Sequence, residues 1–164
     1  LLLKQQGRDF KLYIGGDGVL IHSMHEFVTQ HNLQQHIIFL GPLSHQAVLD
    51  WYHRCDAYLC TSVYETFSIA CAEALCSGLP LICTVLPAVF EYARKEDVIV
   101  VKEASAKYWL LALSDFIHLR WRDKRHDIAN YYQHYFSDHI IAEQYYHFIS
   151  SQFTLIDDDL DTRT

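Results

Sequence analysis

Hydrophobic residues along this chain form short continuous runs, separated by longer stretches in which apolar and polar residues are mixed. Five runs of four to six residues are rich in Ile, Leu, Val or Tyr, and we interpret them as strands. They cover residues 10–14, 37–40, 57–60, 79–84 and 98–101. Continuous runs, rather than strict alternation, are typical of strands that are buried on both faces.

The stretches between these runs have the three-to-four-residue spacing of amphipathic helices. Ser44 is a suitable N-cap for a helix that we expect to end near Arg54. The other helices are predicted over residues 19–31, 68–77, 105–119, 123–135 and 138–153, and residues 1–6 resemble the end of one more. Alternating strands and helices predict an α/β fold with a doubly wound, Rossmann-like parallel sheet.

Composition narrows the class of protein. The chain has 164 residues, of which 51% are hydrophobic and 20% are charged, so it is globular. No apolar run approaches the roughly 20 residues of a membrane helix, and a net charge of −7 argues against a nucleic-acid partner. The five cysteines are odd in number and lack zinc-knuckle spacing, which favours reduced thiols in a cytoplasmic protein.

Residues 65–80 carry the most specific chemistry, with two carboxylates eight positions apart. Glu65 comes just before the expected helix and Glu73 lies inside it. The first N–H groups of this helix, from about Phe67 to Ala70, have no helical partner and face the crevice beyond the strand ends, where they suit a diphosphate. Glu73 is placed to accept hydrogen bonds from a diol such as a ribose.

This segment resembles the donor-nucleotide signature of retaining glycosyltransferases with two Rossmann-like domains (GT-B), the glycosyl transferases group 1 family of glycogen-synthase-like and mannosyltransferase-like enzymes. The resemblance implies that Glu65 faces the donor sugar as the catalytic position and that Glu73 binds the ribose. It also implies that the backbone of four residues holds the sugar and the diphosphate: Phe67, Ser68, Ile69 and Ala70. Ser68 stands where glycine is usual, and serine is expected to fit there if its φ is negative.

Two weaker segments agree with this resemblance, which covers about residues 10–150. Gly15 and Gly16 resemble the family's glycine loop, and Pro42 and Leu43 resemble the turn that lines the nucleobase pocket. In the family, two basic residues neutralise the diphosphate, and they come from the first strand and the helix after it. In an alignment with this chain, both elements would precede Leu1. We therefore expect a sheet that lacks its first strand, an N-terminally truncated domain over residues 1–153, and a disordered acidic tail over 154–164.

The resemblance implies a hexosyltransferase that moves a sugar, with retention, from a UDP- or GDP-type nucleotide diphosphate sugar in polysaccharide, lipopolysaccharide or glycoconjugate synthesis. The acceptor sugar or lipid-linked glycan would be held by an absent N-terminal domain, so this chain alone is expected to be inactive. That domain could also attach a cytoplasmic enzyme to the inner membrane. No cofactor or metal is expected, because His22 and His25 lack the spacing of known zinc strings.

Three other classes of function stay open. The chain could be a catalytically silent nucleotide-binding module or fragment, which Ser68 and the missing strand favour. It could be a sugar-nucleotide epimerase of the same architecture, although no histidine stands at a strand end to act as an acid or base. A structural or interaction role is suggested only by the acidic tail.

Overall fold

The computed structural model of this protein describes residues 1–119 and 121–161. All five strands expected from the sequence are present, at β1 (Leu12–Gly15), β2 (Ile37–Gly41), β3 (Tyr58–Cys60), β4 (Leu81–Thr84) and β5 (Val98–Val101). The helices are α1 (Leu2–Gln5), α2 (Ile21–Gln30), α3 (His45–Arg54), α4 (Ile69–Cys76), α5 (Pro87–Phe90), α6 (Ala106–His118), α7 (Trp121–Tyr135) and α8 (Asp138–Asp161), with a 3₁₀ turn at η1 (Lys95–Asp97).

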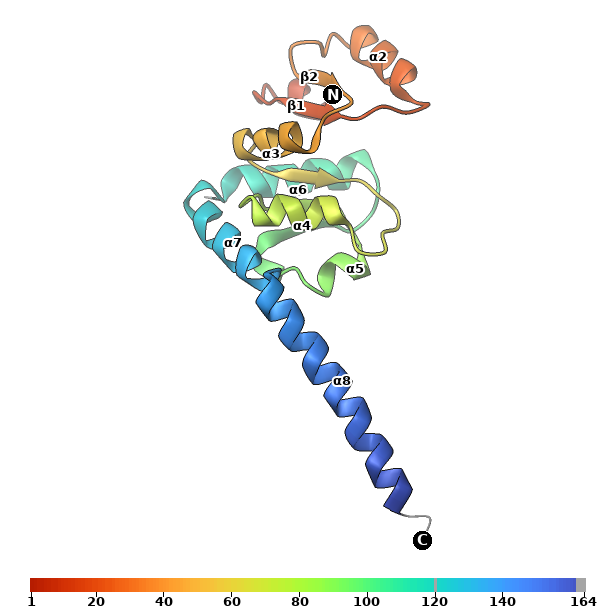
Figure 1. Cartoon of the computed structure of the whole chain (residues 1–164). Coiled ribbons are helices and arrows are strands. Elements are labelled where there is room, and N and C mark those ends of the chain that lie inside the picture. Colours follow the sequence, from red (N-terminus) through yellow and green to blue (C-terminus); the bar gives the residue numbers. More distant parts are fainter. Residues whose placement is uncertain (120, 162–164) are drawn as a thin grey trace.

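Every strand pair among the described residues is parallel, as a doubly wound fold requires, but the strands form two sheets. One sheet has the order β1-β2 and the other β3-β4-β5 (Figure 1). β1 and β3 therefore each keep one unpaired edge. In the doubly wound order the central strand lies between the strands that correspond to β1 and β3, so this split agrees with a sheet that lacks its first strand.

The hydrophobic core surrounds the three-stranded sheet. β4 is buried along its whole length because it has strands on both edges and helices on both faces. One face packs against α4 and α7 in a cluster that includes Leu75, Leu81 and Ile128. The opposite face packs against α6, where Ile82 and Val101 contact Ala112. This core fixes α4, the helix that carries the two-glutamate motif.

Several boundaries differ from the sequence prediction. Ser44 caps α3 as expected, since its hydroxyl accepts a hydrogen bond from the Ala47 N–H at 3.3 Å. The short helix α5 was not expected. α8 continues to Asp161, so the predicted helix end at Phe153 is wrong. The disordered tail over 154–164 stays a prediction, and residues 162–164 lie outside the described residues. No helix in the described part of the chain has both the length and the apolar character to cross a membrane.

Candidate donor site

The loop after β3 and the first turn of α4 form the centre of the candidate site. Glu65 lies in this loop, half-buried, and its carboxylate has no hydrogen bond or ion pair among the described residues. The Thr84 hydroxyl, at the end of β4, donates a hydrogen bond to the carbonyl of Ser62 and ties the loop to the sheet. The strand ends therefore deliver Glu65 to the edge where α/β folds bind ligands.

Ser68 precedes α4 in the left-handed conformation, with φ 65° and ψ 75°. The condition under which serine was expected to fit, a negative φ, is therefore not met. A side chain in this region costs roughly 1–2 kcal/mol because its Cβ approaches the backbone, and a glycine avoids that cost. Ser68 is nevertheless buried, so the surrounding structure has to hold it in place.

Tyr92, which the sequence reasoning did not select, packs directly beneath this turn. Its hydroxyl oxygen lies 3.1 Å from the carbonyl oxygen of Phe67 and 3.2 Å from that of Ser68, so its one proton can be donated to either. Its ring lies 5.0 Å from the Phe67 ring and 5.4 Å from the Phe136 ring, measured between centroids. The turn is thus held from below by a residue 24 positions away in the sequence.

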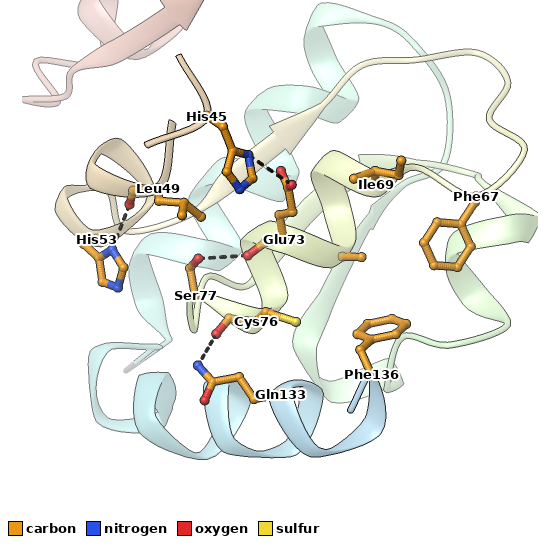
Figure 2. Close-up of a pocket in the computed structure, with 11 residues that line it drawn as sticks. His45, Leu49, His53, Phe67, Ile69, Glu73, Cys76, Ser77, Gln133 and Phe136 are labelled. Atoms are coloured by element: carbon orange, nitrogen blue, oxygen red, sulfur yellow. Dashed lines mark hydrogen bonds and ion pairs between the residues drawn. The ribbon is translucent and has the colours of Figure 1, made fainter. Parts of the chain in front are cut away.

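Glu73 lies one turn into α4 and is half-buried. Its carboxylate oxygen is 3.6 Å from Nδ1 of His45, the first residue of α3, as Figure 2 shows. Burial, and then the charge of Glu73, raise the pKa of Tyr52 to about 12. The neutral Tyr52 hydroxyl donates to the Ala70 carbonyl at 3.3 Å and anchors the first turn of the same helix.

A cleft of about 440 Å³ opens along α4, between α3 and α7 (Figure 2). Its lining residues are His45, Leu49, His53, Phe67, Ile69, Ala72, Glu73, Cys76, Ser77, Gln133 and Phe136. Among these eleven described residues there is no Lys or Arg, so the cleft itself offers no permanent positive charge to a diphosphate. The α4 N-terminus and the two histidines are the groups that can favour an anion.

The structure gathers the sequence-predicted residues into two groups. Phe67, Ile69 and Glu73 line the cleft, and Ser68, Ala70 and Glu65 belong to the same turn and loop. The second group lies at the ends of β1 and β2, where the Gly16 N–H donates to the Gly41 carbonyl at 2.7 Å.

In the second group Gly15 and Leu43 touch. A Cβ at Gly15 would stand 2.9 Å from Cδ1 of Leu43, so a larger residue here would require the Leu43 side chain to shift. Pro42 is exposed beside them. None of these four residues lines the cleft: Gly15, Gly16, Pro42 and Leu43. The turn expected to bind the nucleobase is therefore not part of the cleft that Glu73, the carboxylate expected to bind the ribose, lines.

Three cysteines lie under the site. Cys60 and Cys83 face each other across β3 and β4, and Cys71 in α4 shares a thiol hydrogen bond with Cys60. That bond lowers the pKa of Cys60 to about 6 and raises the pKa of Cys71. All three side chains are buried, which gives them a packing role rather than that of an accessible nucleophile.

Comparison with known proteins identifies the family. The model of the family "Glycosyl transferases group 1" matches residues 1–135. A putative glycosyltransferase of Bacillus subtilis, EpsF, is 34% identical over 80 residues, which is 49% of this chain and 20% of EpsF. The GPI3 subunit of the Saccharomyces cerevisiae phosphatidylinositol N-acetylglucosaminyltransferase is 24% identical over 124 residues, 76% of this chain and 27% of that protein.

Solved structures agree on the fold. Anabaena HepE in complex with UDP superposes with a TM-score of 0.66 at 16% identity, over 87% of this chain and 41% of HepE. The pneumococcal O-GlcNAc transferase GtfA, in complex with UDP and GlcNAc, gives a TM-score of 0.66 at 17% identity, over 91% of this chain and 30% of GtfA. The chain thus spans less than half of each of these proteins, and with a family match over most of its length it belongs to the glycosyl transferases group 1 family.

Proposed function

We propose that this chain is the donor-binding part of a retaining glycosyltransferase that takes its sugar from a nucleotide diphosphate sugar. The observation that carries the proposal is the motif from Glu65 to Glu73, which lies around the α4 N-terminus at the carboxyl ends of the strands in a chain of this family. HepE complexes with UDP and UDP-glucose, and the GtfA complex with UDP, support a UDP-type donor.

In this proposal each part of the turn meets a different part of the donor. The free N–H groups at the start of α4 bind the diphosphate and stabilise the charge that develops on it as the sugar departs. Glu65, whose carboxylate has no partner among the described residues, faces the sugar and steadies the positive charge on its ring. Glu73 accepts hydrogen bonds from the ribose hydroxyls, on the side of α4 where the cleft opens.

The residues of this chain do not account for binding of the acceptor. Transfer needs a second substrate, and we propose that residues of a longer protein hold an acceptor sugar or lipid-linked glycan and supply positive charge to the diphosphate. This chain alone would then bind the donor without transferring its sugar. The absence of Lys and Arg among the described cleft residues supports this division.

Calorimetric titration with UDP, GDP and ADP tests the proposal. Glu73→Gln keeps the shape of the side chain but removes its charge, and we expect it to weaken UDP binding at least about tenfold, or 1.4 kcal/mol. Glu26→Gln is the matched control, because Glu26 also pairs with a histidine, His22 at 3.2 Å, but lies on the remote helix α2.

Two results would contradict the proposal. If the folded wild-type chain binds none of the three nucleotides, its donor site is silent. If Glu73→Gln and Glu26→Gln bind UDP equally well, then Glu73 does not hold the ribose. Preference for GDP or ADP over UDP would keep the site but change the class of donor.

A further inference from the structure

The strained turn before α4 receives a hydrogen bond from outside the motif, from the hydroxyl of Tyr92. Ser68 adopts a left-handed conformation that glycine accepts freely and serine does not. Ser68 O already accepts hydrogen bonds from the N–H groups of Cys71 at 3.0 Å and Ala72 at 3.2 Å, so the helix itself orients that carbonyl. The carbonyl of Phe67 lies outside the helix, and its hydrogen bond comes from Tyr92 at 3.1 Å.

The direction of a carbonyl determines the direction of the N–H group in the same peptide unit. In a trans peptide the two groups point to opposite sides. Because Tyr92 holds the Phe67 carbonyl toward the core, the Ser68 N–H points away from Tyr92, to the solvent side of the turn. The Ser68 carbonyl orients the Ile69 N–H in the same way. Tyr92 therefore influences the direction of the Ser68 N–H, whereas the hydrogen bonds of α4 itself orient the Ile69 N–H.

We propose that Tyr92 is a positioning residue of the donor site, whose hydroxyl keeps Ser68 in its left-handed conformation and aims the Ser68 N–H at the diphosphate. This inference rests on the proposed function. The ring of Tyr92 is buried against Phe67 and Phe136, so the hydroxyl cannot swing away from the turn. Burial raises the pKa of Tyr92, so the hydroxyl remains a donor at neutral pH.

Tyr92→Phe tests this role because it keeps the ring and removes only the hydroxyl. We expect UDP affinity to fall about fivefold while the chain remains folded by circular dichroism. Tyr132→Phe is the control: Tyr132 is also buried, and its hydroxyl donates to Asp97 at 3.0 Å and accepts from the Arg94 N–H at 2.7 Å, but it makes no hydrogen bond to the turn. Its affinity for UDP should stay within twofold of wild type.

A second substitution separates positioning from packing. Ser68→Gly removes the need to hold a serine at positive φ, so the double variant Ser68→Gly/Tyr92→Phe should recover UDP affinity to within about twofold of Ser68→Gly alone. A residue that only packs the core would lower the melting temperature in both backgrounds and leave the affinity of the folded chain unchanged. Unchanged UDP affinity in Tyr92→Phe, or an equal loss in both backgrounds, would overturn the proposal.

The role of Tyr92 can also be measured without a ligand. Without nucleotide, the hydrogen exchange and the NMR chemical shift of the residue-68 N–H should change in Tyr92→Phe relative to wild type. They should change little in Ser68→Gly/Tyr92→Phe relative to Ser68→Gly. If the wild type binds no nucleotide, the proposed function fails, but this amide readout still decides whether Tyr92 orients the turn. An unaltered Ser68 amide in Tyr92→Phe would refute this positioning role of Tyr92.

Discussion

The two sheets of this protein consist of similar apolar strands, yet they differ sharply in burial. β4 in the three-stranded sheet is buried at all four residues, whereas no residue of β1 or β2 is fully buried. Among residues 1–50, Val28 and Leu33 are the buried hydrophobic side chains. The reason is coverage, since β4 has two neighbouring strands and helices on both faces, while β1 and β2 pair only with each other (Figure 1).

This difference divides the candidate donor site into parts that we expect to differ in rigidity. The motif around Glu65 and Glu73 lies on the well-packed half of the molecule, which is the three-stranded sheet with the helices that cover it. Gly15 and Leu43 belong to the other half, the β1-β2 sheet, which has little buried surface. The ring contact between Tyr13 of β1 and Trp51 of α3, at 4.4 Å, connects the two halves. We expect the carboxylates to be positioned more firmly than the glycine loop, because packing density sets local stability.

The largest expected difference between the halves comes from alanine substitution of two glycines with positive φ. A Cβ at Gly78, after α4, would overlap the backbone carbonyl of Arg125 in α7, while a Cβ at Gly16 meets nothing within 4 Å. We expect Gly78→Ala to lower the free energy of unfolding by 3 kcal/mol or more, roughly, and Gly16→Ala by only about 1 kcal/mol. Urea denaturation measures both, and equal losses would refute the comparison.

Hydrogen exchange should show a smaller contrast without any substitution. The amides of β4 should exchange at least about tenfold more slowly than those of β1, because opening β1 exposes little buried surface. Native-state exchange followed by NMR or mass spectrometry reports both strands in one sample. Equal protection would mean that the two sheets unfold as one unit. A longer chain that fills the edges of β1 and β3 should reduce the contrast.

Raising the pH above about 10 should have the smallest effect on the free energy of unfolding, and that effect should come from the well-packed half. Burial raises the pKa of Tyr52, Tyr58, Tyr92 and Tyr132, all of which pack around the three-stranded sheet. Above pH 10, roughly the ordinary tyrosine value, the unfolded chain loses these protons while the folded chain keeps them, so stability falls as pH rises.

The contribution of a single tyrosine to this pH dependence can be isolated. In Tyr58→Phe the decline of the unfolding free energy between pH 10 and 11 should be shallower by at most about 1.4 kcal/mol per pH unit, the limit for one proton. Urea denaturation across this range gives the slope. An unchanged slope would show that Tyr58 titrates alike in both states.

Much of the fold follows from local sequence patterns. The five apolar runs became five parallel strands, because residues that suit a strand buried on both faces have few alternatives in a globular chain. The helix around Glu73 was also predicted, over residues 68–77, and α4 ends just before Gly78, whose φ of 81° is one that glycine adopts readily. The length of α8 was not predicted, because the composition of an acidic segment rich in Asp favours disorder.

The sequence by itself determined the five strands, most of the helices, the family resemblance, and the placement of Glu65 before and Glu73 inside one helix, because each depends on residues close together in the chain. Only the tertiary structure decided that Ser68 is left-handed, that Tyr92 supports it, and that His45 stands beside Glu73. It also decided that the strands form two sheets. Each of these features depends on which distant segments meet, and that is set by how the hydrophobic faces pack together.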